Sequence, residues 1–212
     1  NTVDPDSIIK EYGADTMRLF ILFAAPPETE LEWDDRGIEG ASKFLNRVWR
    51  IQENLQSKAD PELVKALHRT IKKVTADIEE FKFNTAIASL MELTNAIYQT
   101  GADREVFSKL LILLSPIAPH FCEEVWQALG NPDSILRAGW PVFDPQMLVE
   151  KSVELVIQVN GKVRSKITVA ADSTVEQVKE AVLRDEKTVS WLQGKPVRTV
   201  IVVPGKLANI VV

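Results

Sequence analysis

The sequence predicts a multidomain, mainly α-helical chain, in which an antiparallel helical bundle is followed by a small α+β domain of element order ββαββ. Two observations in the 212 residues predict this fold class. Up to about residue 150, apolar residues recur at every third or fourth position between helix start and stop signals. Beyond that point they alternate with polar residues, as in a half-buried strand. The change of period marks a change of domain.

The first two helices are predicted from the signals at their ends. Asp4-Pro5 supplies an N-cap followed by proline at the first helical position, and Gly13 is placed to end this helix. A strongly apolar helix follows over 14–25 and is stopped by Pro26-Pro27. Residues 28–34 then form an irregular connector.

Longer helices complete the first half. Asp60-Pro61 repeats the start signal, and Pro116 precedes the last helix. Short connections between helices of this length favour antiparallel neighbours, and hence a bundle. The predicted ranges are 36–57, 60–80, 84–100, 103–114 and 117–129.

The second half begins after a stretch rich in turn residues. Asn131-Pro132, Gly139 and Pro141 predict a connection that crosses the bundle surface. We therefore expect four parts: a helical segment over 1–33, the helical bundle over 34–135, a linker over 136–150 and the small α+β domain over 151–212.

The small domain is predicted as two hairpins around one helix. Strands over 153–159 and 163–169 flank Asn160-Gly161, which is a strong hairpin signal. Ser173-Thr-Val-Glu176 has the pattern of a capping box and predicts a helix start. Strands over 197–203 and 207–212 flank Pro204-Gly205 and form the second hairpin.

Composition and charge narrow the class of protein. With 45% apolar and 26% charged residues, the chain is neither a disordered tail, nor a collagen-like rod, nor a membrane protein. A single cysteine, Cys122, excludes an internal disulfide and fits a reducing cytoplasm. No secretory leader opens the sequence, and its start at Asn1 predicts a piece of a longer protein.

The net charge of −5 is divided unevenly. Residues 1–150 hold 15 Lys/Arg against 24 Asp/Glu, whereas residues 151–212 hold 10 against 6. A basic module of charge +4 on an acidic body indicates a polyanionic partner for that module.

Motifs for catalysis or metal binding are missing from the sequence. There is no phosphate-binding glycine loop, cysteine pair or nucleophile elbow. His120, Cys122 and the two glutamates after them resemble metal ligands, but with His68 as the only other histidine we favour a buried, structural His120–Cys122 segment. We interpret the acidic residues Glu28, Glu30, Glu32, Asp34 and Asp35 as a solvated helix start rather than as catalytic carboxylates.

The binding candidates are basic. Lys43, Arg47 and Arg50 fall at i, i+4 and i+7 of a long helix, which indicates either a binding row or a solvated face. In the small domain, Arg164 and Lys166 alternate with apolar residues and predict one basic strand face. Three Gly-Lys pairs combine backbone N–H groups with a cation and suit phosphate contact, although Gly-Lys is also ordinary turn chemistry: Gly161-Lys162, Gly194-Lys195 and Gly205-Lys206.

Several motifs together resemble one enzyme family. Tyr12-Gly-Ala-Asp-Thr16 and Arg18-Leu-Phe20 look like the segment after the Lys-Met-Ser-Lys-Ser loop of class I aminoacyl-tRNA synthetases. More specifically, the whole chain resembles the bacterial-type leucyl-tRNA synthetases. The further motifs are Ala25-Pro-Pro-Glu28, Leu31-Glu-Trp33, Gly37-Ile-Glu-Gly40, Arg47-Val-Trp49, Phe83-Asn-Thr-Ala86, Pro116-x-x-Pro-His120, Trp140-Pro141, Val159-Asn-Gly-Lys-Val-Arg164 and Val203-Pro-Gly-Lys206.

The resemblance implies the C-terminal, tRNA-binding part of a leucine–tRNA ligase. The helical bundle would be the anticodon-binding domain, and residues 1–33 would follow the catalytic core. Partners would be tRNA(Leu) and the upstream catalytic and editing domains of the same enzyme, with no DNA or membrane. ATP and magnesium would serve the parent enzyme, whereas this part would hold no cofactor, metal or catalytic residue and would be inactive alone.

Site residues and an alternative function follow from this resemblance. The row on the long helix would contact the tRNA backbone, and the small domain would reach the tRNA elbow with Lys162, Arg164, Lys166, Lys195, Arg198 and Lys206. Trp191, the only aromatic residue of that domain, is expected in the core beneath the second hairpin. Alternatively, the chain is a protein-interaction scaffold that docks a separate catalytic subunit through its apolar helix over 14–25, without RNA binding of its own.

Overall fold

The computed structural model describes residues 3–26, 29–30, 33–149, 152–192 and 194–212, and separates into two compact units. Unit 1 spans residues 1–148 and unit 2 spans residues 149–212, so residues 136–148 of the predicted linker lie within unit 1. Glu28, Leu31 and Glu32 of the predicted connector, and Pro27 of the stop signal before it, lie outside the described residues. No helix in the described part of the chain has the length and apolar character needed to cross a bilayer.

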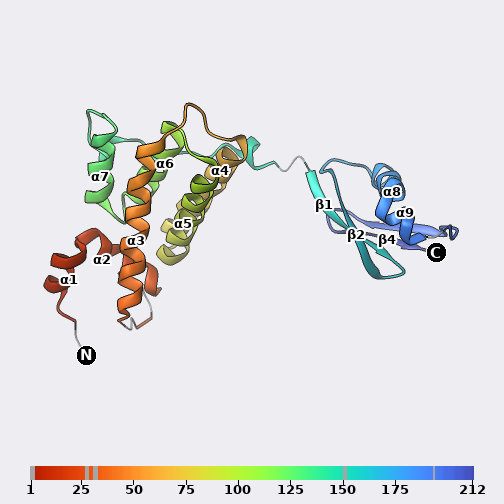
Figure 1. The fold of residues 1–212 in the computed structure, drawn as a ribbon, viewed down its shortest axis with the longest axis horizontal. Coiled ribbons are helices and arrows are strands. Elements are labelled where there is room, and N and C mark those ends of the chain that lie inside the picture. The colour runs from red at the N-terminus through yellow and green to blue at the C-terminus, as the bar shows by residue number, and fades with distance from the viewer. Residues whose placement is uncertain (1–2, 27–28, 31–32, 150–151, 193) are drawn as a thin grey trace. The chain divides into compact units, whose positions relative to one another are not determined.

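Unit 1 is helical, and most of its helix starts agree with the sequence signals. Asp4 and Asp60 each accept a backbone hydrogen bond at the start of a helix, which confirms the predicted N-caps. Asp103 caps α6 in the same way. The helices of Figure 1 are α1 (Pro5–Tyr12), α2 (Ala14–Ala24), α3 (Asp35–Ile51), α4 (Pro61–Glu79), α5 (Phe83–Thr100), α6 (Arg104–Leu114) and α7 (Pro119–Ala128), with 3-10 turns η1 (Gln52–Asn54), η2 (Ile135–Arg137) and η3 (Pro145–Leu148).

Helix α3 ends six residues earlier than the predicted Ser57. After η1 the chain turns toward the loop between α5 and α6, where the backbone N–H of Gln56 donates to the Ala102 carbonyl at 2.9 Å. The Gln56 amide also donates to the Thr100 carbonyl at 3.2 Å. These tertiary bonds replace the helical ones, so the prediction was wrong about this end.

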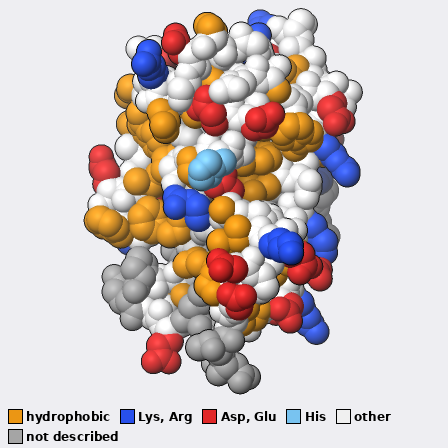
Figure 2. Space-filling model, turned by 90° about the vertical axis from the view of Figure 1, so that its left-hand side faces the viewer, with side chains coloured by type: hydrophobic (Ala, Val, Ile, Leu, Met, Phe, Trp, Pro, Cys, Tyr) orange, Lys and Arg blue, Asp and Glu red, His pale blue; other side chains and the backbone are white. Residues whose placement is uncertain are grey.

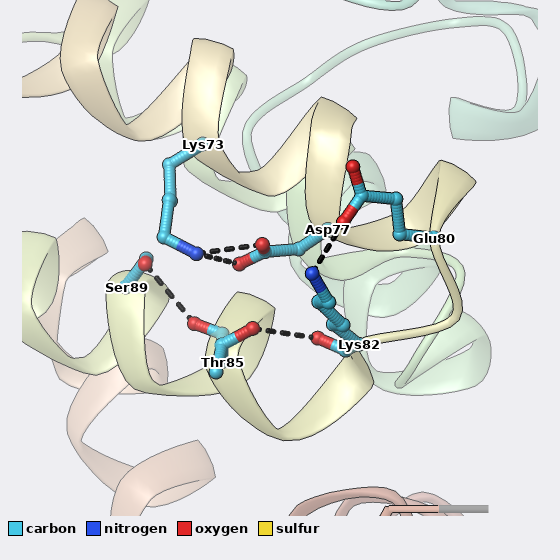
Figure 3. Close-up of polar contacts among 6 residues, drawn as sticks. All are labelled: Lys73, Asp77, Glu80, Lys82, Thr85 and Ser89. Carbon is cyan, nitrogen blue, oxygen red and sulfur yellow. Dashed lines mark hydrogen bonds and ion pairs between the residues drawn. The ribbon is translucent and has the colours of Figure 1, made fainter.

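One hydrophobic core fills unit 1; α2 contributes buried residues to it, and Ile8 and Tyr12 of α1 pack against it. Leu19 and Phe20 of α2 are buried together with Leu90 of α5 and Leu110 of α6. Helices α4 and α5 lie side by side and are joined by a tight corner (Figure 1). At that corner the Lys73 ammonium reaches both carboxylate oxygens of buried Asp77, at 2.6 and 2.5 Å (Figure 3). This ion pair lies within α4, and the corner itself is closed by the Lys82 N–H, which donates to the Asp77 carbonyl at 2.7 Å.

The segment after α7 lies on the bundle, as the turn-rich sequence predicts. The Trp140 indole N–H donates to Thr75 Oγ1 of α4 at 2.9 Å, and the Asp144 N–H donates to Nδ1 of His68, also on α4, at 2.9 Å. The chain therefore stays attached to α4 as far as η3.

Unit 2 is a four-stranded sheet with two helices. Its strands lie in the order β2-β1-β4-β3, in which β1 and β4 run parallel and the two outer pairs are antiparallel hairpins. The elements are β1 (Ser152–Val159), β2 (Lys162–Ala170), α8 (Val175–Arg184), α9 (Glu186–Leu192), β3 (Thr199–Val203) and β4 (Leu207–Val211) (Figure 1). A separate core joins the central strands to the helices, including Leu155, Ile157, Val178, Val182 and Ile210.

Two local predictions in unit 2 were wrong. The capping box is Thr174 with Gln177, one residue beyond the predicted Ser173 with Glu176. A second helix, α9, follows α8, so the order is ββααββ. Asp185 has an extended backbone that ends α8. Its carboxylate accepts hydrogen bonds from the N–H and the hydroxyl of Thr188, and these bonds cap the first turn of α9.

Candidate nucleic-acid interface

The three cations of the α3 row have different surroundings. Lys43 is exposed, with its ammonium 3.2 Å from Glu39 one turn earlier on the same helix. Arg50 is exposed at the rim of a hollow of about 370 Å³ between α3 and the end of α5. These two side chains keep the freedom that a phosphate contact needs.

Arg47 has a structural role in unit 1. Its guanidinium donates to Asn95 Oδ1 at 2.8 Å and lies 4.8 Å from the centre of the Tyr98 ring, and both partners belong to α5. The Tyr98 hydroxyl in turn donates to the Arg47 carbonyl at 2.9 Å. Arg47 therefore joins α3 to α5, a role that its spacing in the sequence did not reveal.

The tip of the first hairpin is closed by side chains. Asn160 and Gly161 have φ values of 48° and 77°, the left-handed pair that a type I′ turn requires. The Gly161 N–H donates to Asn209 Oδ1 at 3.0 Å, and Asn160 Oδ1 accepts from the Val212 N–H at 3.2 Å. The Gly161 N–H is therefore not available to a phosphate, and the interpretation of this Gly-Lys pair was wrong on that point. The exposed ammonium of Lys162 remains.

A β-bulge separates the two cations of β2. Ile157 of β1 pairs with Ser165 and Gln158 pairs with Val163, so Arg164 is the extra residue of the ladder. Arg164 stands against helix α9, whereas Lys166 is exposed and 2.7 Å from Glu154 across the strand pair. The prediction of one basic strand face was wrong, because a bulge shifts the alternation of side chains by one residue.

Trp191 was expected in the core, and this expectation was wrong. Its side chain on α9 is 46% exposed, and the Arg164 guanidinium lies 4.0 Å from the centre of its ring. A half-exposed indole beneath a guanidinium offers a flat, cationic surface on which an RNA base can stack.

The remaining candidate cations lie at different ends of the sheet. Lys162 begins β2 opposite Val159, and Arg198 donates its N–H to the Val211 carbonyl, so both are at the end where β1 and β4 finish. Lys206 lies at the opposite end of β4, in the turn after β3. Lys195 is exposed in the loop between α9 and β3. The structure thus spreads the cations over the rim of unit 2.

The acidic connector acts at a helix start, as interpreted. Asp34 Oδ1 accepts from the Arg36 N–H at 3.0 Å as the N-cap of α3, and Asp35 Oδ1 accepts from the Trp33 indole at 2.8 Å. Glu28 and Glu32 lie outside the described residues.

The prediction of a buried His120–Cys122 segment is confirmed for Cys122 and wrong for His120. Cys122 is fully buried, and this burial raises the pKa of its thiol well above the usual range. The His120 side chain is 81% exposed, with Nδ1 3.0 Å from Asp15 Oδ1. The expectation of a buried histidine was wrong. In the described ranges no three His, Cys, Asp or Glu side chains gather as a metal site requires.

Comparison with known proteins places this geometry in context. The family described as "Anticodon-binding domain of tRNA ligase" matches residues 60–180, more than half of the chain. Proteins named leucine–tRNA ligase match over all of the chain: one from Syntrophobacter fumaroxidans is 48% identical and one from Parasynechococcus marenigrum is 47% identical. The chain spans 29% and 27% of their lengths, respectively.

A solved structure resembles the whole chain as well. It is a LeuRS from Agrobacterium radiobacter K84, crystallised as a ternary LeuRS–tRNA–LeuAMS complex. The TM-score is 0.78 at 29% sequence identity, over 100% of this chain and 30% of that one.

Proposed function

Because the chain belongs to the family of anticodon-binding domains of tRNA ligases, we propose that it is the tRNA-binding C-terminal part of a leucine–tRNA ligase. It would position tRNA(Leu) for ATP-dependent aminoacylation by catalytic and editing domains that precede it. The observation that carries this proposal is the match of the entire chain to leucine–tRNA ligases at 46–48% identity.

Each part of the chain then has its own role in the enzyme. Residues 1–33 follow the catalytic core, residues 34–148 form the anticodon-binding unit, in which 136–148 lie on the bundle, and residues 149–212 reach the tRNA elbow. ATP and magnesium act in the catalytic domain, and we infer a cytoplasmic enzyme. None of the residues discussed above takes part in the chemical step.

Binding would rest on exposed cations around two rigid scaffolds. Lys43 and Arg50 lie on α3, and Lys162, Lys195, Arg198 and Lys206 lie on the rim of unit 2. Such contacts fix the register of an RNA backbone without reading its sequence. The Arg164–Trp191 stack adds a surface for an exposed base, because RNA loops are recognised largely by stacking and shape.

The proposal is tested by titrating the chain with tRNA(Leu) and with a non-cognate tRNA across a salt series. We expect binding that weakens steeply with salt, with a preference for tRNA(Leu). Equal affinity for both tRNAs would reduce the chain to a backbone clamp. Absence of binding at low salt would overturn the proposal.

One observation supports the alternative of a protein-docking scaffold. Ile21 and Phe23 of α2 are 42% and 41% exposed, although α2 also supplies core residues. A chain that binds no tRNA, but forms a stoichiometric complex with a separate catalytic subunit of the same enzyme, would establish this function instead.

A further inference from the structure

A hollow of about 550 Å³ lies between α2, α3 and α7, where motifs far apart in the sequence meet. The Tyr12–Thr16 motif lines one wall, Asn46 and Trp49 of α3 line a second, and His120 and Phe121 line a third. In Figure 2, which shows the face formed by α1 and α7, hydrophobic side chains surround a histidine that also has a basic and an acidic side chain beside it. None of the cations assigned above to RNA binding lines this hollow.

Aromatic rings form part of its wall. The Trp49 side chain is 38% exposed, and its ring centre is 6.3 Å from that of Phe121 at an interplanar angle of 57°. Tilted rings with an exposed face accept a flat aromatic guest.

Neutral polar groups complete the lining. Thr16 is only 5% exposed, and it lines the hollow. The Asn46 amide donates to the Ser42 carbonyl at 2.9 Å, which leaves its oxygen open to a donor. His120 uses Nδ1 toward Asp15, so its Nε2 is open as well.

The charges around the hollow disfavour a phosphate inside it. The Asp15 carboxylate lies behind His120, and Glu11 and Glu39 lie near Tyr12. A side-chain hydrogen bond from Tyr12 to Glu11, followed by burial and these nearby carboxylates, raises the pKa of the Tyr12 hydroxyl. A neutral aromatic group with hydrogen-bonding edges suits this lining better than an anion does.

The hollow is also next to the basic row. Asn46 and Trp49 each precede a cation of that row, Arg47 and Arg50, by one residue on the same helix. Consecutive residues of an α-helix point about 100° apart, so Lys43 and Arg50 lie on the face of α3 that adjoins the hollow, and an RNA backbone bound by them has to bend around α3 for one base to enter.

From these observations we propose that the hollow holds one unstacked base of the bound RNA, stacked on Trp49 and hydrogen-bonded by Thr16 and Asn46. The inference rests on the proposed function and deepens it, because Lys43 and Arg50 position the backbone while the hollow reads a base.

The test compares Trp49→Leu with Trp140→Leu in the 212-residue chain. Trp140 is equally exposed, at 38%, but lies against α4. We expect Trp49→Leu to weaken tRNA(Leu) binding about tenfold, the usual effect of losing one base–aromatic stack. The salt dependence should keep its slope because no phosphate contact is lost. Trp140→Leu should leave affinity unchanged.

Chemical probing of the RNA distinguishes tRNA binding by the chain from binding of a base in the hollow. With wild-type protein we expect one unpaired base to be protected from dimethyl sulfate, and that protection to disappear with Trp49→Leu while the backbone footprint persists. Asn46→Leu, an exposed position, serves if Trp49→Leu does not fold, and should expose the same base. No tRNA binding by wild-type chain would refute the proposed function. Normal binding with unchanged base protection in the folded variants would refute the hollow alone.

Discussion

Asp15 on α2 holds His120 on α7, with Oδ1 of the carboxylate 3.0 Å from Nδ1 of the imidazole. The other carboxylate oxygen accepts from the Phe121 N–H at 2.6 Å. Phe121 lies in the first turn of α7, whose own N-cap residue, Ala118, has no side chain that can accept such a bond. Asp15 therefore caps α7 from a position more than 100 residues away.

This capping role predicts unequal effects of the two partners on stability. Asp15→Ala should lower the free energy of unfolding by about 2 kcal/mol, because a buried cap is lost and the Phe121 N–H is left without its acceptor. His120→Ala should cost less than about 0.5 kcal/mol, because the imidazole is exposed. Urea denaturation monitored by circular dichroism checks this; equal costs would contradict the capping role.

The α3 row should separate into a structural cation and two binding cations. Arg47→Ala should lower the free energy of unfolding by about 1 kcal/mol, since it removes the bond to Asn95 and the contact with Tyr98. Lys43→Ala and Arg50→Ala should change stability by less than about 0.5 kcal/mol. Each should instead reduce the slope of tRNA affinity against salt by about one. An unchanged slope in both variants would remove the row from the interface.

The rim of unit 2 predicts an effect on RNA affinity without an effect on folding. Lys162→Glu combined with Lys206→Glu should weaken tRNA binding strongly at physiological salt, because two phosphate contacts become repulsive. Unit 1 should keep its helical signal and its melting temperature. Lys58→Glu, an exposed reversal in unit 1, is the control. Unchanged affinity in the folded double variant would exclude these two lysines from binding.

The hydrogen bonds to Glu123 predict a pH-dependent contribution to stability. Gln127 and Ser134 donate to its carboxylate, and with the Ile135 N–H they outweigh partial burial and hold the pKa below the ordinary value of 4.5. A lowered folded-state pKa gives stability that is present above 4.5 and is lost as pH falls through the folded value. The variant Glu123→Gln should therefore melt below wild type at pH 7, and the difference should shrink in acid. Glu124→Gln should show no such trend; a gap that persists in acid would contradict the assignment.

Local signals in the sequence predicted most of the fold, and tertiary contacts explain where they were insufficient. Asp4 and Asp60 start their helices as expected, because an N-cap bonds to its own first turn. The end of α3 could not be read in this way, because Gln56 finds its partners in the loop near residue 101. Helix α9 was missed because its start depends on Asp185, which the sequence alone leaves as one more helical residue.

The candidate site was predictable as a set of cations but not as an arrangement. Spacing put Arg47 in the row, but its bond to Asn95 required knowledge of how α3 packs on α5. The bulge at Arg164 shifted strand alternation by one residue and brought the guanidinium to Trp191. The hollow near Trp49 is formed by three segments that meet only in the folded chain.

The parallel pairing of β1 with β4 affects how unit 2 can form during protein synthesis. The ribosome releases β1 some fifty residues before Leu207–Val211, and until then the middle of the sheet has only one of its two hairpins. A single hairpin is marginally stable in water. Unit 2 should therefore gain its structure late, after the bundle of unit 1 has already emerged, and a ribosome stalled just before residue 207 should present a folded unit 1 followed by a protease-sensitive segment.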